Sequence, residues 1–349
     1  MKRNIILDLL RVLACLMVVF YHYFYYGPLV GQVAGKLMDS NIFAYGYLGV
    51  DIFFVISGFV ISSSLKKNNI YSFFKARFKR LYPTYWICLC ISLVIISIFT
   101  KEVFTINEIL MNFTMLQSFF NVKSIDGVYW TLAIEIIFYL MISLMYFFFN
   151  KKLFNFYLMA WLALSYFHVF SLINFGLLSK ILLLNWIPYF IFGFAFSCLI
   201  DKSNNYKYII YILLSVFSLF LLCYRTYLRT ENLINNNGFG VNSYAAVLVL
   251  LSFLCIFVVF VNVTIRSVLF NKVITSLALG TYPLYLLHQE VGYSIFSFSP
   301  IFNNVLGKVS VILSLGLISC YVIPKLENLI IKIFNLVINN EKNYIYKQP

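Results

Sequence analysis

Long apolar runs recur along this chain and decide its fold class. Ten stretches of about 20 residues carry few charges, and this is the length that a bilayer core of about 30 Å requires of a helix. Only 11% of the 349 residues are charged, whereas a soluble domain has roughly 25% charged residues. We therefore expect an all-α integral membrane protein, a bundle of about ten transmembrane helices. The predicted spans are 5–26, 45–65, 83–100, 128–149, 153–173, 181–200, 207–224, 243–263, 273–296 and 304–324.

The basic residues lie unevenly between these spans and predict an orientation. With the N-terminus inside, 18 of the 26 basic residues fall in inner segments and 7 in outer ones, while Arg11 lies within the first span. This bias predicts a multi-pass protein of the cell (cytoplasmic or inner) membrane with both termini cytoplasmic. The net charge of +14 does not indicate nucleic-acid binding, because the basic residues flank apolar spans. We expect one transmembrane domain over residues 1–325 and a basic cytoplasmic tail over 326–349.

The first span carries three ionisable residues on one stripe. At 3.6 residues per turn, Arg11 and His22 lie within roughly 20° of each other and about 16 Å apart along the axis, and Asp8 lies within about 60° of both. Ionisable groups inside a membrane are costly and indicate a functional site by default. The alternative is that Asp8 and Arg11 pair near the interface and that His22 lies among lipid headgroups.

Two carboxylates lie at comparable depths in later spans. Asp51 falls in the first turn of the second span, where it either caps the helix or serves the site. Glu135 lies about two turns into the fourth span, after Trp130, and should face the bundle interior and a cation or a water-filled cavity. A structural hydrogen bond is the alternative for Glu135.

A basic stretch precedes the third span, with four cations in the six residues 75–80. It anchors the chain to anionic lipid, or it forms an anion pocket in which Arg77 and Arg80, three residues apart, share a helix face and grip phosphates. In the ninth span, Pro283 should bend the helix just before Tyr285 and His288. His288 is either functional or a satisfied buried polar residue. Seven cysteines without a CxxC pair and three histidines make a metal site unexpected.

Together these stretches resemble the acyltransferase-3 family of membrane O-acyltransferases, from residue 8 to about residue 325. Each motif is weak alone, but five in this order are specific. The matching segments are Asp8-Leu9-Leu10-Arg11 with His22, Gly49–Phe59, Arg77–Arg80 with Tyr82-Pro83, Trp130–Glu135 with Phe138-Tyr139, and Tyr285–His288.

The resemblance implies a ten-helix bundle that moves an acyl group, expected to be acetyl, from cytoplasmic acyl-CoA to a carbohydrate hydroxyl. The acceptor would be a cell-surface carbohydrate such as O-antigen lipopolysaccharide, capsule or another exopolysaccharide, free or lipid-linked. By the same resemblance His22 is catalytic, and Arg11, Arg77 and Arg80 serve activity or donor binding. No tightly bound cofactor and no metal is expected, and acetyl-CoA would be a substrate.

An imidazole suits this chemistry, because acyl transfer to an alcohol needs a base near neutral pH. We predict that His22 takes the hydroxyl proton, oriented or charge-balanced by Glu135 or Asp51. An acyl-enzyme on His22 or Ser57 stays an alternative. Trp130, Tyr285 and His288 are predicted to contact the acceptor. The rival hypothesis is a transporter, flippase or polymerase of a glycan intermediate, but the ionisable groups concentrate in few spans, which favours a single site.

Overall fold

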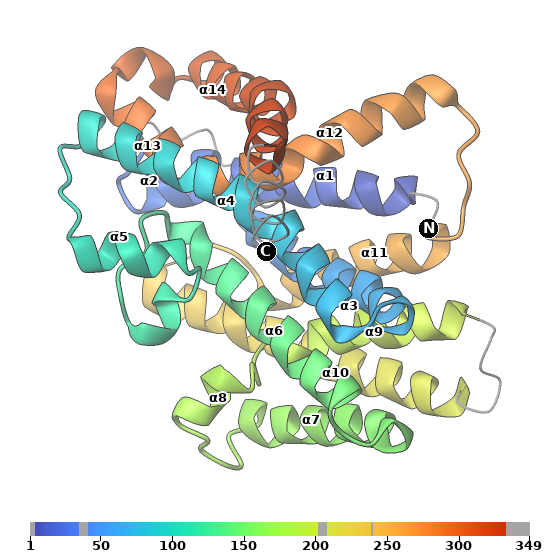
Figure 1. The fold of residues 1–349 in the computed structure, drawn as a ribbon. Coiled ribbons are helices and arrows are strands. Elements are labelled where there is room, and N and C mark those ends of the chain that lie inside the picture. The colour runs from blue at the N-terminus through green and yellow to red at the C-terminus, as the bar shows by residue number, and fades with distance from the viewer. Residues whose placement is uncertain (1–3, 35–40, 202–207, 239, 333–349) are drawn as a thin grey trace, which may run out of the picture.

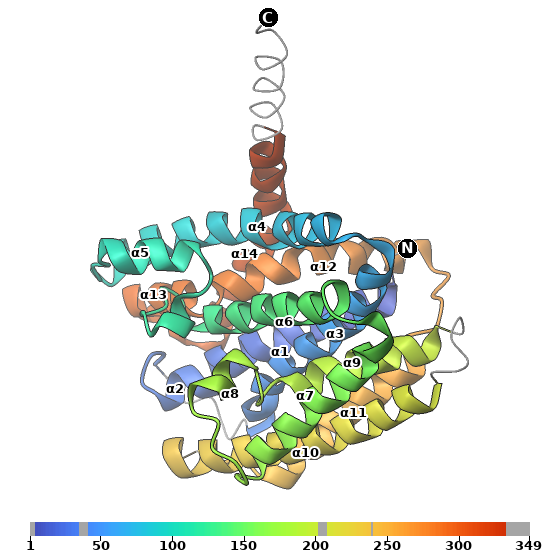
Figure 2. The ribbon, with the colours of Figure 1, turned by 60° about the horizontal axis from the view of Figure 1, so that its bottom comes forward.

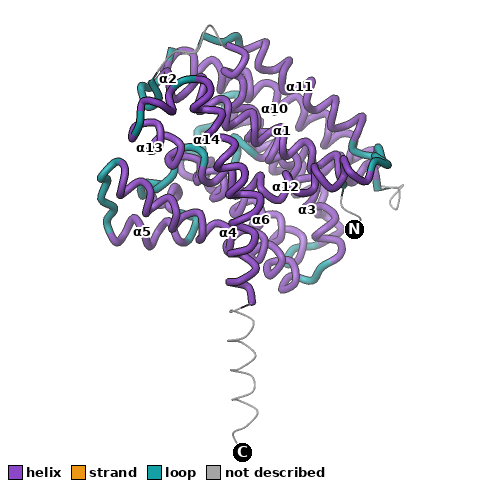
Figure 3. The backbone as a smooth tube through the Cα atoms, turned by 90° about the horizontal axis from the view of Figure 1, so that it is seen from above, coloured by secondary structure: helices purple, strands orange, loops and turns teal. Residues whose placement is uncertain are grey.

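The protein is a bundle of helices. The computed structural model describes residues 4–34, 41–201, 208–238 and 240–332, and within these residues there is no β-strand (Figures 1 and 3). The longer helices are α1 (Ile5–Tyr21), α3 (Gly49–Lys67), α4 (Ile70–Phe99), α6 (Trp130–Phe147), α7 (Phe154–Val169), α9 (Ile187–Ile200), α10 (Tyr208–Asn237), α11 (Ser243–Phe260), α12 (Val268–Leu287) and α14 (Val305–Leu317). Shorter elements join them: η1 (His22–Tyr26), α2 (Gly27–Leu29), η2 (Asn41–Leu48), α5 (Ile106–Phe113), η3 (Gln117–Phe120), η4 (Gly127–Tyr129), η5 (Lys151–Leu153), α8 (Leu177–Ile181), α13 (Glu290–Phe298), η7 (Pro300–Asn303) and η8 (Ile318–Val322).

Seven helical segments in the described part of the chain are long and apolar enough to cross a membrane: Ile5–Leu29, Ile42–Lys67, Ile70–Phe99, Gly127–Phe147, Tyr208–Asn236, Ser243–Phe260 and Val305–Lys332. Large apolar side chains point outward from them, such as Val216, Leu248 and Leu313, which are 61%, 66% and 61% exposed. In water such surfaces would be unfavourable, whereas lipid covers them without cost. The chain is therefore a multi-pass membrane protein.

The predicted count of ten spans is not confirmed. The predicted spans 153–173 and 181–200 correspond to α7 and α9, which have 16 and 14 residues and are shorter than a full bilayer core requires. The predicted span 273–296 is divided between α12 and α13. The sidedness of the termini stays a prediction, since residues 1–3 and 333–349 lie outside the described residues.

Two helices extend beyond their predicted ends. The third span was expected to begin at Pro83, but α4 begins at Ile70, where the Asn69 side chain accepts a hydrogen bond from the Ser72 amide at 2.8 Å, and it continues through a buried Pro83. Helix caps of this kind fix a helix start. The seventh span was expected to end at residue 224, whereas α10 continues to Asn237. The basic stretch 75–80 is therefore part of α4, and Arg225 and Arg229 are helical rather than part of an outer loop.

Helix α1 lies inside the bundle, packed against α3 and α12 (Figure 1). Its regular turns end at Tyr21, and η1 continues the chain as a π-helix that begins at His22. The most extensive helix packing in the described chain joins α3 and α9. It is close because glycines face each other's backbones: a Cβ on Gly58 would lie 1.9 Å from the Phe190 carbonyl oxygen. Small residues allow such approach between membrane helices.

The C-terminal part of the described chain projects from the bundle beside α4 (Figure 2). Residues 323–332 are helical, and the Thr84 hydroxyl on α4 donates to the Glu327 carboxylate at 2.9 Å. Of the predicted tail 326–349, residues 326–332 belong to this helix, and residues 333–349 lie outside the described residues.

Candidate active site

His22 is buried at the point where α1 changes into η1. A π turn widens the helix by one residue and is frequent at functional sites. The ring lies on the bundle interior, where it is 9% exposed and lines a cavity of about 450 Å³. We call this space the histidine cavity, and its lining includes Tyr26, Tyr47, Trp130, Trp186, Arg229 and Tyr285. The lipid-headgroup alternative for His22 is therefore wrong.

A second histidine, His288, lies directly behind His22 and fixes its tautomer. Nδ1 of His288 lies 2.8 Å from the Tyr285 carbonyl oxygen, which can only accept, so this nitrogen carries the proton. In the neutral ring Nε2 of His288 is then an acceptor, and it lies 3.0 Å from Nδ1 of His22. Nδ1 of His22 must donate, to His288 or to the Val18 carbonyl oxygen at 3.0 Å. The lone pair of His22 is thus left on Nε2.

His288 lies at the break between α12 and α13, where Pro283 was expected to bend one continuous span. Helix α12 runs through Pro283 and ends at Leu287. Asp126, before α6, accepts a hydrogen bond from the Glu290 amide at 3.1 Å and so holds α13 in place. His288 is fully buried and lines none of the cavities described here. The structure therefore places His288 behind His22 and outside the walls of these cavities.

Asp51 pairs with Arg229 and not with His22. Its two carboxylate oxygens accept from both terminal nitrogens of Arg229 at 2.9 and 2.8 Å, and Asp51 is completely buried. The guanidinium also lies over the rings of Tyr47 and Trp186, at 4.7 and 5.4 Å. Such bidentate pairs are geometrically specific. Asp51 thus positions an arginine on the wall of the histidine cavity.

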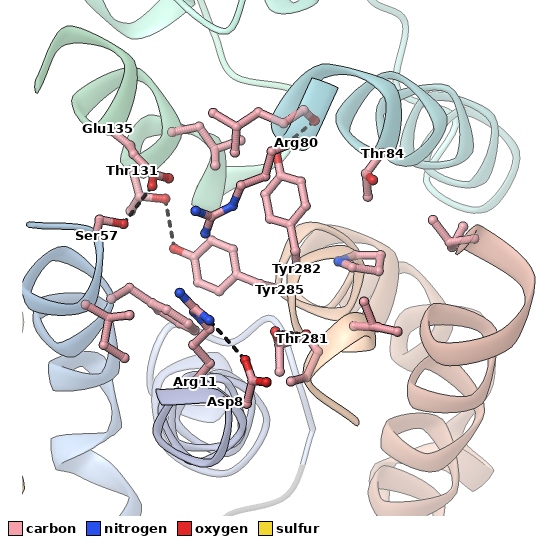
Figure 4. A pocket seen from close by; sticks show the side chains of 18 of the residues that line it. Asp8, Arg11, Ser57, Arg80, Thr84, Thr131, Glu135, Thr281, Tyr282 and Tyr285 are labelled. Atoms are coloured by element: carbon pink, nitrogen blue, oxygen red, sulfur yellow. Dashed lines mark hydrogen bonds and ion pairs between the residues drawn. The ribbon is translucent and has the colours of Figure 1, made fainter. Parts of the chain in front are cut away.

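A second cavity, of about 470 Å³, adjoins the first. Figure 4 shows the side chains of Arg11 and Arg80 pointing into it from α1 and α4. We call it the arginine cavity. Arg11 also pairs with Asp8 at 3.1 Å, so the predicted Asp8–Arg11 pair exists within the cavity wall. No hydrogen bond or ion pair occupies the Arg80 guanidinium among the described residues.

Glu135 also lines the arginine cavity. Its Oε1 accepts a hydrogen bond from the Ser57 hydroxyl at 2.7 Å (Figure 4) and another from the Tyr139 hydroxyl. Glu135 thus faces the bundle interior as predicted, but on the far side of Tyr285 from the histidine pair. The predicted contact of His22 with Glu135 or Asp51 is replaced by the contact with His288.

Arg77 and Arg80 do not form the predicted shared anion pocket. Arg77 donates to the Ser64 hydroxyl at 3.1 Å and lies over the rings of Phe73 and Tyr139, at 5.8 and 5.5 Å. It lines neither the histidine nor the arginine cavity. Although the two residues are three apart on α4, their long side chains diverge, and only Arg80 reaches the cavity.

Tyr285 lies between the two cavities. Both cavities are lined by Tyr285 and by Val50. The Thr131 hydroxyl donates to the Val128 carbonyl oxygen at 2.9 Å, so the Tyr285 hydroxyl, 3.0 Å from Thr131, is the donor of that pair. The Tyr285 ring is therefore fixed between the arginines and the histidines. Trp130 packs against Trp186 with ring centroids 5.1 Å apart on the wall of the histidine cavity.

The sequence interpretation missed Arg229 and Trp186. Arg229 lies beyond residue 224, where the seventh span is predicted to end. Two arginines at i, i+4 repel each other, so their spacing gives no local signal that the helix continues. Among the described residues, no three His, Cys, Asp or Glu side chains gather as a metal site would require.

The comparisons with known proteins agree with this arrangement. The model of a family described as an acyltransferase domain, acyltransferase-3, matches residues 4–324. The chain belongs to the acyltransferase-3 family. The residues that line the histidine and arginine cavities therefore lie within the matched region, apart from Glu327.

Two curated relatives match shorter parts of the chain. A putative acetyltransferase, ORF330, of Acidianus two-tailed virus is 30% identical over 138 residues, which are 39% of this chain and 39% of that protein. The O-acetyltransferase OatA of Staphylococcus aureus is 33% identical over 103 residues, which are 28% of this chain and 15% of that protein. The chain thus covers well under two thirds of the length of either relative. No solved structure matches the chain.

Proposed function

We propose that this protein is a membrane O-acyltransferase that moves an acetyl group from acyl-CoA to a hydroxyl of a cell-surface carbohydrate, such as a capsule, an O-antigen or another exopolysaccharide. The observation that carries the proposal is the pair of adjoining cavities, one with arginines and one with an imidazole, which share Tyr285. The names of the two relatives, an acetyltransferase and an O-acetyltransferase, support acetyl as the group transferred.

The donor lies in the arginine cavity and extends past Tyr285. Arg11 and Arg80 attract its diphosphate, because guanidinium groups bind phosphate oxygens well. The rise from Arg11 to His22 is about 16 Å, a gap that a flexible pantetheine arm bridges. The lysine excess near the N-terminal end of α1 supports a cytoplasmic position for this end of the bundle.

The acceptor lies in the histidine cavity. Trp130 and Trp186 offer apolar ring faces against which a sugar ring packs. Nε2 of His22 takes the proton of the acceptor hydroxyl while the hydroxyl oxygen bonds to the thioester carbonyl carbon. The C–S bond then breaks, and the CoA thiolate leaves and takes this proton from His22. Direct transfer needs no acyl-enzyme, and the Val18 carbonyl oxygen and His288 together keep the lone pair of neutral His22 on Nε2.

The test is an acetyl-transfer assay on purified protein in nanodiscs, with acetyl-CoA and a carbohydrate acceptor. His22→Ala should lower turnover by about 10²- to 10⁴-fold, the range typical of a lost general base. His168→Ala is the matched control, since His168 lies on α7 and lines none of the cavities, and it should keep wild-type turnover. Wild-type turnover by a folded His22→Ala variant would refute the mechanism. A wild-type protein that moves glycan without consuming acetyl-CoA would identify a carrier instead.

A further inference from the structure

A third cavity, of about 580 Å³, lies at the N-terminal end of α1. It is enclosed by the start of α1, the ends of α3 and α9, and Asn262 after α11. We call it the lysine cavity, since Lys66 and Lys67 line it. Asp8 and Arg11 line both this cavity and the arginine cavity. The three cavities thus form a row along α1, with the lysines at one end and His22 at the other.

The lysine cavity holds more positive than negative charge. Its cations are Arg11, Lys66 and Lys67, and its acids are Asp8 and Asp201. Arg11 pairs with Asp8 at 3.1 Å, and Lys66 with Asp201 at 2.8 Å. No acidic side chain in the described part of the chain pairs with Lys67.

Polar groups complete the lining of the lysine cavity. Ser62, Ser63, Ser197 and Asn262 lie on its wall beside the lysines. The Ser62 and Ser63 hydroxyls already donate to the Phe59 and Val60 carbonyl oxygens, at 3.2 and 3.0 Å. The donors that can face an anionic oxygen are therefore the lysine ammonium groups, the Ser197 hydroxyl and the Asn262 amide. Much of the wall is apolar, from Leu7, Phe59, Val60 and Ile200, and the lysine end provides the cations and donors that bind a phosphate group.

We infer that the lysine cavity binds the ribose phosphomonoester of the acyl-CoA donor, through Lys67 and Lys66. This rests on the proposed function. CoA carries phosphate in two places: the diphosphate at the head of the pantetheine arm and a separate monoester on the ribose. Arg11 and Arg80 serve the diphosphate in the adjoining cavity, and Asn4, at the N-terminal end of α1, lies about 10 Å beyond Arg11 along the helix. The two phosphate positions and the thioester therefore follow the order of the three cavities.

The inference also leaves only one phosphate-binding residue, Arg80, in the basic stretch 75–80 on α4. Of its four cations, only Arg80 lines any of the three cavities, and Arg77 is engaged with Ser64 and two aromatic rings. The phosphate-binding cations are thus distributed over α1, α3 and α4 instead of one segment.

The experiment compares two donors on each variant. Purified protein in phosphatidylcholine nanodiscs is titrated with acetyl-CoA and with acetyl-3′-dephospho-CoA, and Kd is measured by calorimetry. Lys67→Ala should raise the Kd for acetyl-CoA about tenfold, because a charged hydrogen bond is lost, and leave the Kd for the dephospho donor unchanged. Lys66→Gln should do the same. Lys79→Ala, a basic residue of the α4 stretch that lines no cavity, should change neither value, and Arg80→Ala should weaken both donors.

Three results would overturn the inference while the proposed function survives. Lys67→Ala and Lys66→Gln could leave acetyl-CoA binding intact, they could weaken both donors equally, or their effect could require added phosphatidylglycerol, which would identify a lipid-headgroup site. A wild-type protein that binds neither donor would instead refute the proposed function itself. The comparison of the two donors separates these cases without any measurement of turnover.

Discussion

Nδ1 of His22 and Nε2 of His288 lie 3.0 Å apart, although 266 residues separate the two rings in the chain. In the proposed mechanism His288 is a positioning residue, because it contacts His22 and lines none of the three cavities. The Tyr285 carbonyl oxygen completes the arrangement by accepting a hydrogen bond from Nδ1 of His288 at 2.8 Å. The Tyr285 carbonyl oxygen, the His288 ring and the His22 ring therefore form a hydrogen-bonded series that ends at the lone pair on Nε2 of His22.

His288→Ala should lower kcat by about 2- to 10-fold, because Nδ1 of His22 then keeps only the Val18 carbonyl oxygen as its acceptor and one hydrogen bond contributes about 0.5–1.5 kcal/mol. The KM values for donor and acceptor should stay near wild type. His288→Gln offers a carbonyl oxygen that can accept from Nδ1 of His22, so it should retain more activity than His288→Ala. Steady-state kinetics of the folded variants check this. Equal activity of the Gln and Ala variants would mean that His288 only fills space.

The sequence could predict the relative positions of residues that lie on the same helix. Asp8, Arg11 and His22 share a stripe because the helical repeat places them there, and all three line cavities. The contacts between distant helices, His22 with His288 and Asp51 with Arg229, depend on tertiary packing, and no local pattern specifies them.

Local sequence patterns also gave wrong predictions where a long side chain reaches a distant partner or where a buried ion pair stabilises a charged residue. Arg77 and Arg80 share a helix face, yet Arg77 reaches Ser64 while Arg80 reaches the cavity. Arg229 lies in a polar sequence that indicates a loop, but a buried carboxylate on α3 lets α10 continue through it. Polar residues in membrane helices are tolerated where a partner satisfies them, and that partner is not visible in the sequence.

The buried pair of Asp51 and Arg229 should be costly to break from one side. Asp51→Ala leaves an uncompensated guanidinium in the interior and should lower the free energy of unfolding by about 3–5 kcal/mol. The double variant Asp51→Ala with Arg229→Met removes both charges and should be more stable than Asp51→Ala alone. Thermal unfolding in detergent measures both. A double variant as unstable as the single one would show that packing, and not the lone charge, dominates the loss.

The close packing of α3 on α9 predicts a different response at two helical glycines. Gly58→Ala would place a Cβ 1.9 Å from the Phe190 carbonyl oxygen, so the helices must separate and the melting temperature should fall. Gly316→Ala on α14 has no atom within 4 Å of the new Cβ and should be neutral or stabilise by up to about 1 kcal/mol. Thermal unfolding of the two variants gives the comparison. An unchanged melting temperature for Gly58→Ala would contradict the observed helix spacing.

Trp130 should affect the acceptor and not the donor, because it lines the histidine cavity alone. Trp130→Ala removes an apolar face and should raise the acceptor KM about tenfold, as expected for roughly 1.5 kcal/mol of lost aromatic contact. The donor KM should not change, and Trp130→Phe should lie between the two. Initial rates at varied acceptor and fixed acetyl-CoA measure the effect. A higher donor KM with an unchanged acceptor KM would move the acceptor out of this cavity.

Tyr285 should control how much of the donor is lost to water. Its ring separates the arginine cavity from the histidine cavity, so Tyr285→Ala joins the two spaces and admits water beside the thioester. Acetyl-CoA hydrolysis without acceptor should therefore rise relative to transfer. The hydrogen bond that orients His288 uses the Tyr285 backbone carbonyl, so the substitution leaves it in place. Tyr285→Phe keeps the ring and loses only the hydroxyl contact with Thr131, so its hydrolysis should stay close to wild type. Release of free CoA, measured with and without acceptor, separates the two variants, and equal hydrolysis by both would show that the ring is no barrier.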